Sequence, residues 1–453
     1  MHSPASRREF LRRAGAFSAF GAAAPWALNL AATAAASANQ PGDYRALVCL
    51  FMYGGNDNHN TVVPYDVANY NLYSGIRTNI AVPRAELAAT QIVPTRPWTN
   101  DRQMALHPKL LPLKTLFDEG RLAVAMNVGT LTREGTTLAD YKAGIGLPPK
   151  LFSHNDQQSV WQSSLAEGAS SGWGGRIADL LASGNGDATF TSISAAGNAV
   201  FMSGKDVVQY QVTGAGSVQI KPVFGSTAST DALKRLIQRT STHLFEEEHA
   251  VIARRSIAAD AKVRAALAHV PDMTFPPTPL GAQLKIVARL IAARAELGVK
   301  RQVFFVSQGG FDNHDFLIDQ HPGLLGSVAG AMQAFYTATD ALGVANSVTT
   351  FTGSDFGRTL ANNGDGSDHG WGSHHFVMGG AVKPKAWVGG VPAVSLAEGP
   401  DNVGGGRLLP AIGVDQYGAT LARWMGVTDS QLATVLPNIG NYTKRDLGFM
   451  TRS

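Results

Sequence analysis

The feature that most constrains the fold is a unit of helix, glycine and strand that occurs three times. In each unit an amphipathic helical segment is followed by Gly120, Gly298 or Gly343. The strands that follow are expected at residues 122–128, 303–307 and 348–352. Glycine often ends a helix because it accepts a left-handed backbone conformation. Helices that alternate with buried strands are typical of βαβ units, so the sequence predicts an α/β fold: a doubly wound, mostly parallel sheet flanked by helices.

A further strand is expected at residues 46–53, which read ALVCLFMY. A nearly continuous apolar run of this length is typical of a strand that is buried on both faces, as in a parallel sheet. The run contains Cys49, the one cysteine of the chain. It cannot form an internal disulfide, and we expect a buried thiol without a catalytic role.

The 453 residues could form one large α/β domain or two smaller ones. Residues 187–225 alternate apolar with polar side chains, which predicts short antiparallel strands or an insertion. A long helix is expected at 243–269, and a proline-rich connector follows at 271–279. We therefore predict a single domain over residues 39–453, with an insertion around 187–279.

Residues 1–38 have the features of an export signal rather than of a folded domain. The segment Ser6–Arg12 reads SRREFLR, which matches the twin-arginine signal, and an alanine-rich apolar run follows it. Residues 36–38 read ASA, which fits a cleavage site. The alternatives are a basic helix and an uncleaved membrane anchor. We expect export by the twin-arginine machinery to the periplasm or the medium.

The charge of the mature chain excludes one class of partner. The net charge is +4, and it falls to +1 when residues 1–38, with their four arginines and one glutamate, are removed. No basic run remains that would indicate nucleic-acid binding. No second apolar stretch is long enough to cross a bilayer, so we expect no stable membrane span after cleavage.

Acidic and imidazole side chains follow three of the expected strands. The strand at 46–53 leads to Asp57, the strand at 303–307 to Asp312 and His314, and the strand at 348–352 to Asp355. A glycine-rich loop behind the last strand adds Asp368 and His369. In an open parallel sheet, ligands bind beyond the carboxyl ends of the strands. Mixed oxygen and nitrogen ligands suit one or two divalent cations; we favour zinc, with calcium, magnesium or manganese as alternatives.

The same loop continues with the adjacent histidines His374 and His375. Neighbouring side chains on an extended segment point in opposite directions. We therefore expect one of the two to face the site and the other to be structural.

Two further residues are candidates for catalysis. Ser153 precedes His154 and Asp156 at the start of an expected helix. It could be a simple N-cap, or its hydroxyl could be a nucleophile at a helix N-terminus, where backbone amides stabilise anions. Arg358 could neutralise an oxyanion of the substrate; the alternative is an ordinary surface arginine.

Six motifs resemble one known family. They are GGNDNHNTVVPY (54–65), FSHNDQQSVWQSS (152–164), GWGGRIAD (172–179), GGFDNHD (309–315), SDFGRT (354–359) and SDHGWGSHHFVMGG (367–380). Over essentially the whole mature chain, the sequence resembles a bacterial exported family known as domain of unknown function 1501. That family is placed among the alkaline phosphatase and sulfatase superfamily folds, so the resemblance implies an alkaline-phosphatase-like core.

The resemblance to the superfamily implies two-metal hydrolysis of phosphate or sulfate esters. The residues that match its metal ligands and its nucleophile are Asp57, Ser153, Asp312 with His314, Asp355 and His369. One departure is Phe356, which stands in SDFG where the superfamily commonly has SDHG, and phenylalanine cannot bind a metal. A literal SDHG occurs at 367–370. Either His369 replaces the missing ligand from a new direction, or one metal site is lost.

The sequence as a whole predicts an exported, metal-dependent hydrolase. Its substrate would be a small anionic ester or a sulfated or phosphorylated polymer. One alternative is a non-catalytic binding or structural protein with a degenerate metal site on the same fold. A second alternative is a hydrolase whose histidines act without a metal.

Overall fold

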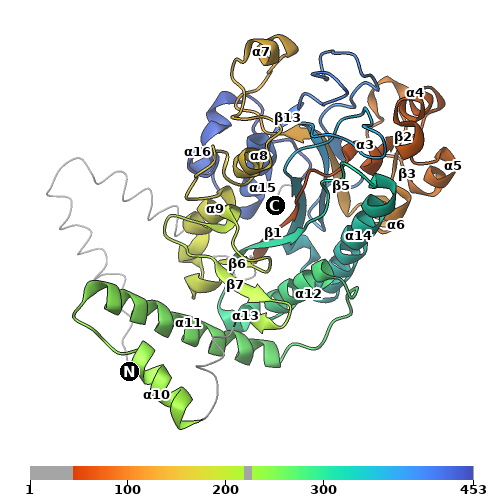
Figure 1. The fold of residues 1–453 in the computed structure, drawn as a ribbon. Helices are drawn as coiled ribbons and strands as arrows, with labels where there is room; N and C mark the ends of the chain where they lie inside the picture. The colour runs from red at the N-terminus through yellow and green to blue at the C-terminus, as the bar shows by residue number, and fades with distance from the viewer. Residues whose placement is uncertain (1–43, 219–226, 452–453) are drawn as a thin grey trace. The chain divides into compact units, whose positions relative to one another are not determined.

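The strand β1 (Arg45–Met52) lies at the centre of the main sheet in the computed structural model (Figure 1). It pairs in parallel with β9 (Arg301–Gln308) on one side and with β10 (Val348–Ser354) on the other. All three strands were expected from the sequence, and each end lies within two residues of the expected one. The loops that follow them therefore leave the sheet at the same edge.

The structure describes residues 44–218 and 227–451. The predicted export segment, residues 1–38, lies outside the described residues, and so does the predicted domain boundary at residue 39. Among the described residues, no helix is both long and apolar enough to cross a membrane.

Within the described residues, ten strands form the main sheet in the order β12-β5-β11-β10-β1-β9-β6-β7-β8, and β13 also pairs with β5. The remaining bounds are β5 (Leu122–Gly129), β6 (Ser192–Ser194), β7 (Tyr210–Thr213), β8 (Gly216–Ser217), β11 (Ser373–Gly379), β12 (Trp387–Val388) and β13 (Ile412–Gly413). β11 is antiparallel to both of its neighbours, β10 and β5. The other pairs are parallel except β7–β8, which confirms a mostly parallel sheet.

Part of the segment expected to be a separate insertion belongs to the main sheet. β6 pairs in parallel with β9, and β7 pairs in parallel with β6. Only the short β7–β8 pair is antiparallel, as the alternation had predicted. An alternating pattern identifies a strand but not its partner, so the sequence could not show that these strands extend the sheet.

Helices cover both faces of the sheet, which confirms the doubly wound arrangement. Ala46, Val48 and Leu50 point to one face, and Leu47 and Cys49 point to the other. The first face packs against α6 (Leu111–Asp118), α12 (Pro279–Ala292) and α14 (Leu317–Ala341). The second packs against α8 (His154–Ser163), α9 (Trp173–Leu181), α15 (Val414–Met425) and α16 (Leu432–Val435).

The thiol of Cys49 is free and buried, as predicted. Burial raises its pKa well above the usual value for cysteine, which keeps it protonated and unreactive.

Other elements flank this core. A small antiparallel sheet consists of β2 (Val62–Pro64), β4 (Met104–Leu106) and β3 (Gln91–Ile92), and α4 (Val67–Arg77) follows β2. The helix expected at 243–269 is α11 (Leu244–Ala268), and α10 (Ala228–Ile237) precedes it.

A buried ion pair fixes the loop that follows β1. The guanidinium of Arg77, at the end of α4, donates to both carboxylate oxygens of Asp57 at 3.0 and 2.8 Å. It also donates to the carbonyls of Thr359 and Leu360 in the loop after β10. Both side chains are almost fully buried. The pair therefore joins three segments that are far apart in the sequence.

We predict that Arg77→Ala lowers the free energy of unfolding by about 3–5 kcal/mol, because it leaves the charge of Asp57 buried without its partner. The matched control is Arg133→Ala, which removes a partly exposed pair with Asp140 and should cost about 1 kcal/mol or less. Chemical denaturation of both variants measures the difference. Equal losses would show that the buried pair does not stabilise the fold.

The same pair predicts how stability changes in acid. Burial alone would raise the pKa of Asp57, but the charge and hydrogen bonds of Arg77 outweigh it and hold the pKa well below its usual range. A lowered carboxyl pKa stabilises the fold above the unfolded-state value of about 3.9, and this stabilisation is lost as the pH falls below it. The stability difference between wild type and Asp57→Asn should therefore shrink in acid.

Candidate metal centre

The loops after β1, β9 and β10 meet at the carboxyl edge of the sheet. Two glycines allow this approach. Gly54 has a φ of +112°, and a Cβ atom there would lie 2.4 Å from the backbone nitrogen of Asp312. A Cβ on Gly55, whose φ is +84°, would lie 2.4 Å from the ring of Phe356. Only residues without a side chain let the three loops pack this closely.

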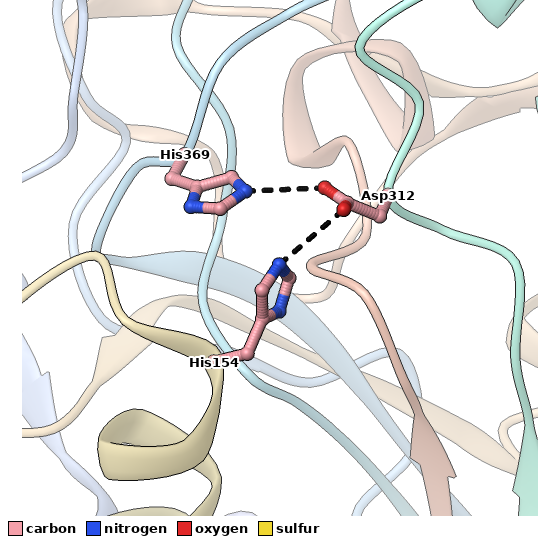
Figure 2. Close-up of side chains that lie close together, drawn as sticks. All are labelled: His154, Asp312 and His369. Carbon is pink, nitrogen blue, oxygen red and sulfur yellow. Dashed lines mark hydrogen bonds and ion pairs between the residues drawn. The ribbon is translucent and has the colours of Figure 1, made fainter.

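The carboxylate of Asp312 is the common partner in the site: Figure 2 shows it joined by dashed lines to both His154 and His369. Its Oδ1 accepts a hydrogen bond of 2.6 Å from the guanidinium of Arg358. The same oxygen lies 3.1 Å from Nε2 of His369 and 3.1 Å from Nε2 of His314. Its Oδ2 lies 3.4 Å from Nε2 of His154. Three imidazoles and one guanidinium therefore surround a single carboxylate.

Each of the three imidazoles has its other ring nitrogen held near an oxygen. Nδ1 of His369 lies 2.8 Å from the carbonyl of Phe152. Nδ1 of His154 lies 2.6 Å from Oδ2 of Asp355, and Nδ1 of His314 lies 3.4 Å from Oδ1 of Asp368. For His154 and His369 the oxygen beside Nδ1 is the nearer one, which favours the proton on that nitrogen and leaves Nε2 as an acceptor.

The Nε2 atoms of His154 and His369 thus present lone pairs toward Asp312. Nε2 of His314 and Nε2 of His369 are only 2.9 Å apart. Two acceptors at this distance need either a proton or a cation between them. Together with Oδ1 of Asp312 they form a triangle with sides of 2.9, 3.1 and 3.1 Å.

This arrangement fits a metal ion. Ligands about 2.0–2.1 Å from a tetrahedral zinc ion lie roughly 3.3 Å from one another, which is close to the sides of the triangle. Ligand atoms of His154, Asp312 and His369 also lie within 4.8 Å of one another. Metal-bound histidines commonly have their second nitrogen fixed by a carboxylate or a carbonyl, as here. The residues present could therefore hold one divalent cation.

The electrostatics of the site favour the ligand protonation states of Asp312 and His369. Burial alone would raise the pKa of Asp312, but the hydrogen bond and charge of Arg358 outweigh it, so the pKa is lowered. Burial lowers the pKa of His369. An ionised carboxylate and a neutral imidazole are the forms that bind metals.

Sequence reasoning missed His154, whose pKa is raised mainly by its hydrogen bond to Asp355. It is the first residue of α8 and does not follow a strand. The pattern of acidic and imidazole side chains at strand ends therefore does not include it. Asp355 also accepts hydrogen bonds from Gln158 at 2.8 Å and from the backbone N–H of Gly54 at 3.2 Å. The position of His154 beside Ser153 in the motif FSHND was the one available signal.

The structure brings together three of the six predicted metal ligands, Asp312, His314 and His369. Asp355 and Asp368 lie behind them and contact the imidazoles of His154 and His314. Asp57 is not brought into the cluster, because both of its oxygens are occupied by the ion pair with Arg77 and by neighbouring donors.

The predicted catalytic residues have other contacts. Arg358 is fully buried, so the surface alternative is wrong. Its guanidinium donates to Asp312 and to the carbonyls of Gly54 and Ser367, which makes it a positioning residue for Asp312. Ser153 occupies the N-cap position of α8 but makes no side-chain cap; its hydroxyl donates to Asp156 at 2.8 Å.

The expectation that His374 or His375 faces the site is not met. Both are buried in β11. Nδ1 of His374 accepts a hydrogen bond of 3.0 Å from the backbone of Asn127, and His375 packs against Trp161 with ring centroids 4.8 Å apart. Because β11 returns into the sheet, both faces of this segment are covered by protein.

The family model described as "Protein of unknown function (DUF1501)" matches residues 44–431. A comparison with curated protein sequences finds no match.

Similar solved structures include the soluble domain of lipooligosaccharide phosphoethanolamine transferase A from Neisseria meningitidis, with 9% identity, a TM-score of 0.35 and coverage of 92% of this chain and 96% of that one. The PsFucS1 sulfatase from Pseudoalteromonas sp. has 10% identity and a TM-score of 0.36, with coverage of 94% and 77%. The lipoteichoic acid synthase LtaP from Listeria monocytogenes has 8% identity and a TM-score of 0.29, with coverage of 88% and 78%.

We predict that the mature protein binds Zn²⁺ and that His369→Ala and Asp312→Ala each weaken this binding at least about 100-fold, because each removes a ligand from a small set. Isothermal titration of metal-free protein with Zn²⁺ measures the affinity. His269→Ala, at an exposed histidine at the end of α11, is the control and should bind as wild type does. Unchanged binding in either site variant would contradict the assignment.

Proposed function

The chain belongs to the DUF1501 family of proteins of unknown function, and we propose that it is an exported, metal-dependent hydrolase of phosphate or sulfate esters. The observation that carries the metal part of this proposal is the convergence of three imidazole Nε2 atoms on the carboxylate of Asp312. The ester class comes from the motifs that resemble the alkaline phosphatase and sulfatase superfamily.

Asp312, His314 and His369 would hold the cation, with His154 beside them. Zinc suits a set that is richer in imidazole than in carboxylate, whereas calcium and magnesium prefer oxygen ligands. A zinc ion in such a site lowers the pKa of a bound water to about 7 and polarises an ester oxygen.

The protein's own side chains would position this centre. Arg358 fixes the orientation of Asp312 through a hydrogen bond from a fully buried position. Asp355 and Gln158 do the same for His154. This buried support would keep the ligands in place without substrate.

Part of the site is exposed to solvent. The side chains of Asp312 and His314 are 44% and 41% exposed. An ester group on a sulfated or phosphorylated polymer could reach them as easily as a small anionic ester. Export by the twin-arginine route, predicted from residues 1–38, would place the enzyme in the periplasm or the medium, where such polymers occur.

One observation favours the non-catalytic alternative. The guanidinium of Arg358 lies 2.6 Å from the same Asp312 oxygen that completes the triangle with His314 and His369. A permanent positive charge there neutralises part of the carboxylate, so the fold could be stable without a cation. A protein that binds no metal and hydrolyses neither ester would support this alternative.

We predict that zinc-loaded mature protein hydrolyses an aryl phosphate or an aryl sulfate and that chelation abolishes the activity. His369→Ala should reduce kcat/KM to the background rate. Asp355→Asn should reduce it about 10–100-fold, because it weakens the support of His154 without removing one of the proposed metal ligands. Release of the aryl alcohol is the measurement, with His269→Ala as the control. Activity that survives chelation would overturn the metal-dependent mechanism.

A second prediction separates the two possible nucleophiles. Because the hydroxyl of Ser153 donates to Asp156 and not to the cluster, we expect an activated water to attack the ester. Ser153→Ala should then retain kcat within about three-fold of wild type, since it removes no group that reacts. A loss of more than about 1,000-fold, or a phosphorylated enzyme found by mass spectrometry, would instead establish Ser153 as the nucleophile.

A further inference from the structure

Arg407 contacts the proposed metal ligand His369, although no motif in the sequence singles it out. Its Nε donates a hydrogen bond of 2.9 Å to the backbone carbonyl of His369. Its guanidinium carbon also lies over the ring of Phe152, 5.4 Å from the ring centroid. A guanidinium in this position is attracted to the negative face of the aromatic ring. Arg407 therefore links two segments of the site that are far apart in the sequence.

These two segments hold His369 from two sides. The backbone carbonyl of Phe152 lies 2.8 Å from Nδ1 of His369. A carbonyl oxygen can only accept, so this contact places the proton of the neutral imidazole on Nδ1 and leaves Nε2 free for a metal. The Nε–H of Arg407 holds the backbone carbonyl of the same histidine. The ring and the backbone of His369 are thus both fixed, the first through Phe152 and the second through Arg407.

Phe152 needs support to keep its carbonyl in this place. Its φ is +71°, in the left-handed region that residues with a side chain rarely adopt. Such a conformation persists only where the surrounding structure holds it. The guanidinium of Arg407 over the ring is one contact that does so. Loss of Arg407 would therefore loosen Phe152 as well as the backbone of His369.

A tight turn holds Arg407 itself. Residues 404–406 are three glycines, all with positive φ, and Arg407 follows them directly. The backbone N–H of Arg407 closes the turn by donating to the carbonyl of Gly404 at 3.1 Å. Two more backbone hydrogen bonds join this segment to the loop that carries His369, one on each side of the histidine: Ala361 N–H to the Gly405 carbonyl at 3.1 Å, and Gly372 N–H to the Leu408 carbonyl at 2.9 Å. The turn is therefore docked on the loop.

We propose that Arg407 is a positioning residue for the metal ligand His369. It acts through the backbone carbonyl of His369 and through the ring of Phe152, whose own carbonyl orients the imidazole. The inference rests on the metal centre of the proposed function. Groups that orient a metal-bound histidine are typically worth about 10–100-fold in metal affinity.

Titration of the metal-free mature protein with Co²⁺ tests the proposal, because the visible absorption of Co²⁺ reports the geometry of its ligands. Arg407→Ala should bind Co²⁺ about 10–100-fold more weakly and with a changed spectrum. Arg407→Lys keeps the positive charge but not the Nε donor, so it should recover only part of the affinity. The matched control is Arg84→Ala: Nε of Arg84 donates to the carbonyl of Tyr65 at 3.0 Å, and its guanidinium lies 4.5 Å from the centroid of that ring. This control loses the same two kinds of contact and should bind as wild type does.

Nitrogen-15 NMR of the histidines in metal-free protein gives a second readout. His369 should carry its proton on Nδ1 in wild type and show a mixture of tautomers in Arg407→Ala. Equal Co²⁺ affinity and an equal spectrum in the two proteins would overturn the proposal. A wild type that binds no Co²⁺ would refute the metal centre of the proposed function, and the positioning of His369 is then decided by the NMR comparison alone, where the same single tautomer in both proteins overturns it. If circular dichroism shows that Arg407→Ala is unfolded, Arg407→Met, which keeps much of the side chain's length, takes its place in both experiments.

Discussion

The pairing of β1 with two parallel neighbours determines where the chemistry lies. Met52, at the end of β1, is in register with Gln308 of β9 and Ser354 of β10, so three chains leave the sheet at one level. Each of the three loops carries one aspartate. Asp312 and Asp355 both contact His154, whereas Asp57 is buried beside Arg77 outside this cluster. Buried or neighbouring carboxylates stay ionised only where cationic or hydrogen-bonding groups compensate them. Each aspartate therefore needs such a partner.

Each of the three aspartates has a different partner. Asp57 is paired with Arg77 from α4, and Asp355 lies against His154 from α8. Asp312 is the most exposed of the three, and it has Arg358 and the converging imidazoles around it. The carboxylates of Asp57 and Asp355 therefore hold protein groups in place. Asp312 is the carboxylate that remains able to bind a cation.

The sequence allowed the place of the site to be predicted, but not the division of roles within it. Strand ends follow from apolar runs, and parallel strands bring their ends together, so the approach of Asp312 and His369 could be foreseen. The partner of Asp57 could not be foreseen, because Arg77 belongs to a helix whose position depends on tertiary packing. His154 was missed for the same reason. No sequence pattern predicts which helix has its N-terminus at the carboxyl edge of the sheet. The antiparallel direction of β11 could not be predicted either, since an apolar run does not indicate how a strand is oriented in the sheet.

Phe356 explains why the cluster is compact. It stands where the superfamily commonly has a histidine, and it is buried, with its ring centroid 4.5 Å from His369 and 4.8 Å from His154. The aromatic ring packs against both imidazoles and offers no ligand atom to a metal. Asp355 lies against His154. His369 reaches Asp312 from the loop, which is the geometry of the first alternative raised by the sequence. A single cation beside one supported imidazole is therefore the arrangement that these side chains fit.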